Sequence, residues 1–214
     1  YYPVRDAPPF RDLAPAGTDI TPDAETVAVG RRVLAYAGVR WIVIFRRDPG
    51  LDQEDLTQFL ARYAEPNPLY QDEEVVVYRP LPGNDLDRFI APFKGWYPSE
   101  VAADGGSRFR WFGDLASADV WNFTAAPRDY TLRFDTSTYR TPRRLEVRLD
   151  GRVLGRWEVV NGRHIEIPVR LDPGGHLLEF FALDPPVRPL DLDPTIRDDR
   201  SLSFAVANLV LADR

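Results

Sequence analysis

The sequence predicts an α+β protein, in which a small α/β unit of the βαβ type precedes an antiparallel, jelly-roll-like β-sandwich. Three observations predict this. Apolar residues in the first third of the 214-residue chain recur with helical spacing and alternate with short continuous apolar runs. After a proline-bounded segment, apolar and polar residues instead alternate with the period of a strand. Turn dipeptides separate these alternating segments at short intervals, as is typical of a sandwich.

These changes in pattern divide the chain into four parts. Residues 1–18 are rich in proline and have no period, which indicates an extended lead-in. Residues 19–80 form the small α/β domain, and residues 81–92 are a proline-bounded linker. Residues 93–214 form the β-sandwich domain.

The α/β domain is predicted to begin with a helix over residues 22–37. Thr21 is a suitable N-cap, Pro22 suits the first helical position, and Gly38 is the expected C-terminal stop. The apolar run 39–45 then has the length and β-branched content of a buried strand.

A second helix is predicted over residues 52–63, because Asp52 is a suitable N-cap and one helical face is apolar. That face consists of Leu56, Phe59, Leu60 and Tyr63. The next apolar run, 75–78, is a strand. A strand, a helix and a strand in this order predict a βαβ unit, so the two strands should be parallel neighbours.

The sandwich strands follow from alternation, with turns at Asp150-Gly151 and Asn161-Gly162. One face of these strands should form a shared core, which includes Phe134, Leu145, Val147, Phe180, Phe204 and Val206.

The last strand contains a change of phase. Phe204 and Val206 are in phase with each other, whereas Leu209 and Leu211 are out of phase with them. One extra residue near 207–208 would return both leucines to the core. We therefore predict a β-bulge there.

Composition excludes several kinds of function. The net charge of −6 argues against a nucleic-acid partner, and the absence of cysteine excludes disulfides and thiolate chemistry. No apolar run approaches the about 20 residues that span a bilayer, so we expect no direct membrane insertion. The chain contains no methionine, so we expect a fragment of a longer protein or a processed one.

Two stretches, GVRWIVIFR at 38–46 and YQDEEVVVYR at 70–79, flank the acidic-capped helix. Together they resemble the soluble region after the transmembrane helices of bacterial polytopic membrane glycosyltransferases, in the superfamily of protein mannosyltransferases and aminoarabinose transferases. The second half resembles the β-sandwich that ends some of those proteins. The residues that carry this likeness include Gly95-Trp96-Tyr97, Glu100, Arg110-Trp111, Asn122, Leu149-Asp150-Gly151, Pro173-Gly174-Gly175-His176 and Asp199-Arg200.

This resemblance implies an extracytoplasmic module that is tethered to the membrane through the transmembrane part of a parent protein. In that family the catalytic acids lie in the membrane part, outside this sequence. No catalytic residue is carried over, and we expect this fragment not to be an enzyme.

Residues 95–123 hold three of the five tryptophans and suggest a carbohydrate site. Trp96, Tyr97 and Trp111 could stack on a sugar ring, while Glu100 and Arg110 could hydrogen-bond its hydroxyl groups. The alternative is structural. In that case the aromatic rings close one end of the core, and the charged side chains form an internal ion pair.

The sequence contains two further groups of side chains that could be considered for a metal site. Asp191, Asp193, Asp198 and Asp199 form an oxygen-rich cluster that is an alternative site for structural calcium, and we expect no other metal or cofactor. The two histidines, His164 and His176, do not make a zinc site.

We therefore predict a non-catalytic accessory module of a membrane glycosyltransferase-like protein, with a glycan and the parent's transmembrane part as partners. A structural or protein-interaction domain without a ligand is the first alternative, and a glycoside-active enzyme is the second. A groove with aromatic faces and polar rims would favour sugar binding. A cleft with two facing carboxylates would favour the enzyme.

Overall fold

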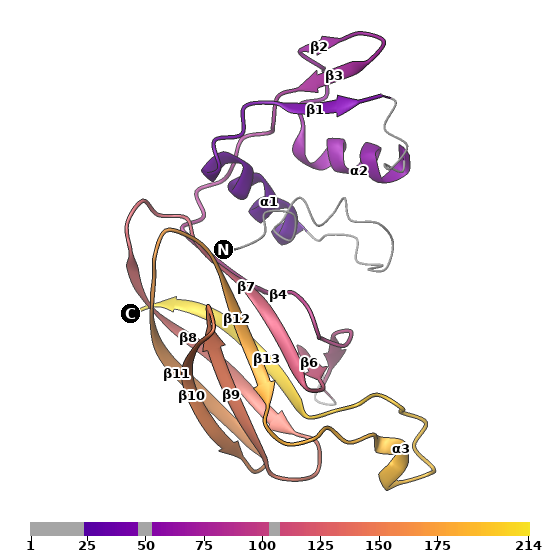
Figure 1. Ribbon diagram of the computed structural model, residues 1–214, viewed down its shortest axis with the longest axis vertical. Coiled ribbons are helices and arrows are strands. Elements are labelled where there is room, and N and C mark those ends of the chain that lie inside the picture. The colour runs from indigo at the N-terminus through magenta and orange to yellow at the C-terminus, as the bar shows by residue number, and fades with distance from the viewer. Residues whose placement is uncertain (1–23, 47–52, 103–107) are drawn as a thin grey trace. The chain divides into compact units, whose positions relative to one another are not determined.

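The computed structural model describes residues 24–46, 53–102 and 108–214. The chain forms two compact units, Tyr1–Asp87 and Arg88–Arg214 (Figure 1). No helix within the described ranges is both long and apolar enough to cross a bilayer.

The first unit contains two helices and a three-stranded sheet. Its elements are α1 (Ala24–Tyr36), β1 (Ile42–Phe45), α2 (Gln53–Tyr63), β2 (Tyr70–Gln71) and β3 (Val75–Tyr78). The strand order is β1-β3-β2. The predicted helices and the two predicted strands are confirmed, while the caps Thr21 and Asp52 lie outside the described residues.

The predicted parallel pairing within this unit is wrong. β1 and β3 are neighbours, but they run antiparallel, with Ile42 opposite Tyr78. The cause is β2, which is too short to show in the apolar pattern. The Asp72 carboxylate accepts hydrogen bonds from the backbone N–H groups of Glu74 and Val75, each at 2.8 Å, and so closes the turn that reverses the chain before β3. Helix α2 therefore connects β1 to β2, with β3 inserted between them.

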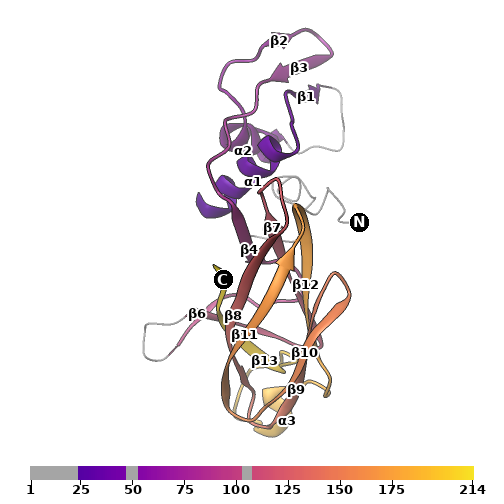
Figure 2. The ribbon, with the colours of Figure 1, turned by 90° about the vertical axis from the view of Figure 1, so that its left-hand side faces the viewer.

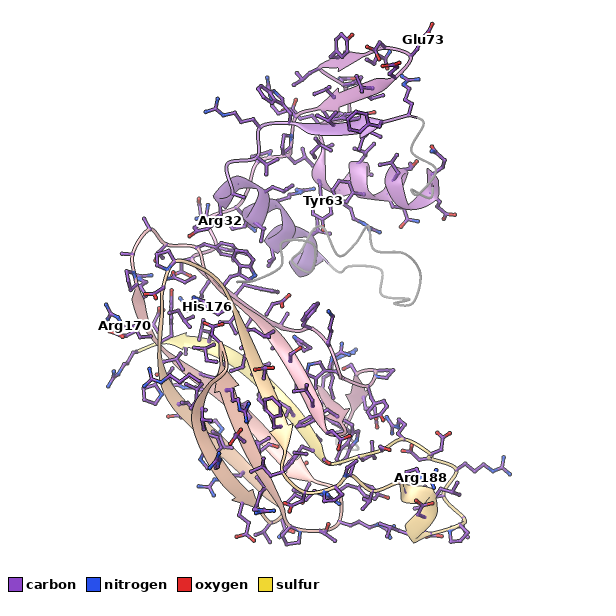
Figure 3. All side chains as sticks on the ribbon, viewed as in Figure 1. Arg32, Tyr63, Glu73, Arg170, His176 and Arg188 are labelled. Carbon is purple, nitrogen blue, oxygen red and sulfur yellow. The ribbon has the colours of Figure 1, made fainter. Side chains whose placement is uncertain are left out.

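Helices α1 and α2 of the first unit share a buried cluster. Leu34, Phe59 and Tyr63 are buried together, and the rings of Phe59 and Tyr63 lie 4.9 Å apart. Tyr63 projects from α2 (Figure 3) and covers Gly30 of α1, where an added Cβ would lie 2.6 Å from the tyrosine ring. Only glycine allows this close contact between the helices.

The second unit is an antiparallel β-sandwich, as predicted (Figures 1 and 2). The elements of this unit are β4 (Arg88–Pro92), β5 (Glu100–Val101), β6 (Arg108–Phe112), β7 (Leu115–Asn122), β8 (Arg128–Thr138), β9 (Arg143–Leu149), β10 (Arg152–Val159), β11 (Gly162–Leu171), β12 (Gly174–Ala182), the short helix α3 (Pro189–Leu192) and β13 (Phe204–Asp213). One sheet has the order β10-β9-β12-β7-β4 and the other has the order β11-β8-β13-β6-β5.

The predicted linker, residues 81–92, includes a strand that the sequence did not reveal, β4. Residues 88–92, which the prolines placed in the linker, pair with β7 as an edge strand. Phe89 is buried, and the Arg88 side chain donates a 2.7 Å hydrogen bond to the Leu211 carbonyl and forms an ion pair with Asp213 at 2.9 Å. This strand is too short and too close to prolines for its alternation to be visible in the sequence.

The predicted sandwich core is confirmed. All six residues named from the alternation belong to one buried cluster between the two sheets. Phe134 and Phe180 meet edge to face across that core, with ring centroids 5.3 Å apart.

The predicted β-bulge is also confirmed. The pairing of β13 with β8 loses register between Ala207 and Val210, and Asn208 adopts a left-handed conformation with φ of 52°. As a result Leu211 is buried, whereas Val210 is 45% exposed. Asparagine is one of the few residues that adopt this conformation without a large penalty.

Candidate functional site

Trp96 helps to close the sandwich core. Its indole Nε1 donates a 2.6 Å hydrogen bond to the Ser117 carbonyl. Its ring meets those of Phe112 and Phe180 edge to face, both at 5.4 Å. This is the structural alternative that the sequence left open.

Tyr97 and Arg110 tie the segment before β5 to the sandwich. The Tyr97 hydroxyl accepts a 3.1 Å hydrogen bond from the Ser201 backbone N–H and donates one to the Ser201 carbonyl at 3.3 Å. Arg110 donates to the Tyr97 carbonyl at 3.3 Å. Both side chains therefore have partners within the fold.

Glu100 forms an ion pair with Arg200 at 2.6 Å. Arg200 also contacts Asp198 at 2.7 Å, and its guanidinium lies 5.3 Å from the centre of the Tyr97 ring. Hydrogen bonds to Asp198 and then to Glu100 raise the pKa of Arg200 above its ordinary value. The predicted internal ion pair thus exists, but its cation comes from the segment before β13.

Trp111 differs from the other four candidates, because it lines a cavity of about 510 Å³ on the outer face of sheet β11-β8-β13-β6-β5. Phe112 points into the core, so side chains alternate along β6 and place Trp111 and Phe109 on the opposite face. The two rings meet at 90° with centroids 6.1 Å apart. Trp111 also meets Tyr139 edge to face at 5.8 Å.

Strand register assembles the cavity from two rows of residues across four strands, β6, β13, β8 and β11. One row is Trp111, Ala205, Ser137 and Gly162, and the other row is Phe109, Ala207, Asp135 and His164. The middle of each row has small or short side chains, which form the floor of the cavity. The aromatic rings of Trp111 and Phe109 rise above this floor and form one wall.

Asp135 and His164 line the side of the cavity away from Phe109 and belong to a polar cluster. The Asp135 carboxylate accepts hydrogen bonds from His164 Nδ1 and from the Asn208 amide, each at 2.7 Å. His164 Nε2 lies 3.3 Å from Glu166 Oε1, and Glu166 forms a 2.9 Å ion pair with Arg133. This cluster therefore offers both hydrogen-bond donors and acceptors beside the cavity.

The electrostatics of this cluster do not favour Asp135 as a general acid. The hydrogen bonds from Asn208 and then from His164 lower the pKa of Asp135. The carboxylate of Asp135, followed by that of Glu166, raises the pKa of His164. A glycosidase general acid needs a carboxyl group whose pKa is raised, which is the opposite of what Asp135 has.

Three carboxylates of the acidic cluster that the sequence offered for calcium have partners within the fold. Asp191 pairs with Arg188 at 2.9 Å, and Asp193 accepts hydrogen bonds from Thr195 at 2.7 and 3.0 Å. Asp198 is held by Arg200. Across the ranges that the structure describes, no three His, Asp or Glu side chains are grouped so that they could hold a metal ion.

Sequence reasoning missed Phe109, Asp135, His164 and Asn208 as site residues. The available signal was their phase, since Asp135 and His164 alternate with the core residues Phe134 and Ile165 and must face outward. Phase alone does not show which outward-facing residues of different strands become neighbours. That depends on register, which here joins residues that are 29 and 73 positions apart.

No protein-family model matches the chain, and no curated protein matches it. A family 35 carbohydrate-binding module from an environmental isolate has a TM-score of 0.34 at 9% identity and covers 59% of this chain and 93% of that one. A family 35 module from Clostridium thermocellum has a TM-score of 0.34 at 14% identity, with 58% and 93% covered.

A third similar structure is the C-terminal family 6 carbohydrate-binding module of a marine laminarinase from Zobellia galactanivorans. Its TM-score is 0.33 at 13% identity, and the match covers 56% of this chain and 91% of that one. Values this low do not assign the chain to a family.

Proposed function

We propose that the sandwich is a non-catalytic module that binds carbohydrate in the cavity on the outer face of sheet β11-β8-β13-β6-β5. One observation carries the proposal. The cavity joins an aromatic wall, Trp111 and Phe109, to the hydrogen-bonding wall around Asp135 and His164.

The cavity has the physical properties that a sugar requires. A pyranose has C–H faces that pack on aromatic rings and hydroxyl groups that need directed donors and acceptors. The volume of about 510 Å³ lies within the range of about 300 to 1,000 Å³ that is usual for small-molecule sites. The small side chains of Ala205 and Ala207 and the absence of a side chain at Gly162 let a ring approach the sheet.

We also propose on which side of the cytoplasmic membrane the module lies. By the resemblance of residues 38–46 and 70–79, we place the chain outside the cytoplasmic membrane, beside the transmembrane part of a glycosyltransferase-like parent. Protease accessibility of a tag inserted after Arg214 in the intact parent, measured on spheroplasts, tests this placement. Protection of the tag in intact spheroplasts would contradict it.

NMR titration of the chain with a panel of bacterial cell-wall oligosaccharides and neutral oligosaccharides tests the binding proposal. We expect shift changes at Trp111, Ala207 and His164 with Kd from tens of micromolar to millimolar, about 4 to 6 kcal/mol. Ala207→Leu should abolish these changes without altering the melting temperature, because the new side chain fills the cavity and displaces no core atom.

Trp111→Ala should weaken binding, while Trp41→Ala serves as a control because Trp41 is an exposed tryptophan of the first unit. Because Trp111→Ala also removes ring contacts, its melting curve is measured in parallel. Shift changes that map elsewhere, or an Ala207→Leu variant that binds like the wild type, would overturn the proposal.

A further inference from the structure

The bulge of β13 lies beside the cavity. β-Bulges often occur next to functional sites, where they redirect a side chain. Here the bulge places Asn208 at φ of 52° and directs its amide to Asp135 Oδ2 at 2.7 Å. We infer that Asn208 is a positioning residue of the proposed carbohydrate site, which acts through Asp135 to hold the His164 ring and so makes ligand binding depend on protonation of that ring.

The first step of this mechanism is the fixed carboxylate of Asp135. Its Oδ2 accepts from Asn208, and its Oδ1 accepts from His164 Nδ1. The terminal torsion of an aspartate is soft, so a single partner would leave the carboxylate plane free to turn. With Asn208 on one oxygen, the direction of the other oxygen is set. The imidazole that it holds is set with it, beside the cavity.

The second step is the charge of the ring. His164 Nδ1 and Nε2 both face carboxylate oxygens, those of Asp135 and Glu166. Both contacts are hydrogen bonds only when both nitrogens carry a proton. The charged groups around the ring are Asp135 and Arg133 from β8 and Glu166 and Arg163 from β11, while β13 contributes the neutral Asn208.

The direction of the pH effect follows from these contacts. The Asp135 carboxylate, with a further contribution from Glu166, raises the pKa of His164. Below that pKa the ring is held on both sides. Above it, one ring nitrogen presents a lone pair to a carboxylate, and the ring is held on one side only. Since the inference rests on the proposed function, ligand affinity should fall as the pH rises through the pKa of His164.

Titration of the two histidines by NMR, in the full chain without ligand, tests the positioning role. Asn208→Gly removes the amide but keeps a residue that adopts positive φ, so the bulge persists. We expect the pKa of His164 to shift in this variant, because the Asp135 carboxylate that raises it is no longer held by Asn208. His176 is the internal control, because it contacts Asp150 and Asp172 and should titrate as in the wild type. A His164 titration identical to the wild type would overturn the inference.

A binding experiment tests the link to the ligand. With an oligosaccharide that binds the wild type, Asn208→Gly should weaken binding at pH 6 by roughly 2- to 10-fold, the effect of one hydrogen bond. In a His164→Gln background the same change should have no further effect. Equal losses in both backgrounds would show that Asn208 does not act through His164. If the wild type binds no glycan, the proposed function fails, while the titration still decides the role of Asn208.

Discussion

The two units of the chain differ in how completely they cover their apolar surfaces. In the sandwich, both sheets contribute to one continuous buried cluster. In the described part of the first unit, Leu34, Phe59 and Tyr63 form a separate buried cluster, and Val29, Val33, Leu56 and Val76 are also buried, while Trp41 and Phe45 are each 63% exposed. Because stability grows with buried apolar area, the sandwich should be the stable unit and the first unit the weaker one.

The largest expected effect tests this contrast with one residue type. Phe204 is fully buried in the sandwich, so Phe204→Ala should lower the free energy of unfolding by roughly 3 to 5 kcal/mol. Phe45→Ala should change it by no more than about 0.5 kcal/mol, because that side chain is mostly in solvent. Denaturant melts of both variants measure the difference. Similar losses would remove the contrast between the units.

A change confined to the first unit sharpens the comparison. Gly30→Val would place its side chain in the position of the Tyr63 ring and should destabilise that unit by about 1 to 3 kcal/mol. Hydrogen exchange should quicken in α1 and α2 and stay unchanged in the sandwich strands. Faster exchange throughout both units would show that they unfold together.

A smaller effect is expected from His176, which is labelled in Figure 3 and whose contacts join two turns of the sandwich. His176 Nδ1 lies 2.6 Å from Asp150 Oδ2, and Nε2 lies 2.8 Å from the Asp172 carbonyl. Burial alone would lower the pKa of His176, but the hydrogen bonds to Asp150 and Asp172 outweigh it and raise the pKa.

The stabilisation by protonated His176 is therefore fully present below about pH 6.5 and is lost as the pH rises through the raised pKa of His176. The loss should be about 1 kcal/mol or less, because Asp150 is half exposed. Melts of the wild type and His176→Gln between pH 5.5 and 9 measure it. A wild-type dependence on pH that persists unchanged in the variant would assign the effect to other groups.

The smallest expected signal is catalytic. The hydrogen bonds from Asn208 and His164 lower the pKa of Asp135, whereas a general acid needs a raised one. The isolated chain should neither transfer nor hydrolyse glycosides above a heat-inactivated control, in assays with nitrophenyl and lipid-linked sugars. Turnover above that control would favour the enzyme alternative.

The sequence by itself determined the local features of this protein. Alternation in each strand identified the core around Phe134 and Phe180, and the change of phase near 207–208 identified the bulge. These features are readable because the two-residue period of a strand is local, and a shift by one residue would expose the whole core face.

Only the tertiary structure decided the features that depend on pairing between distant segments. The two-residue strand β2 reversed the expected direction of β3 relative to β1, although the apolar runs themselves were correctly placed. Of the five candidate site residues, Trp111 alone reached the cavity, where it shares one row with Ala205. Local patterns show which face a side chain occupies, but the hydrogen-bond register between strands decides its neighbours, and a single strand does not encode that register.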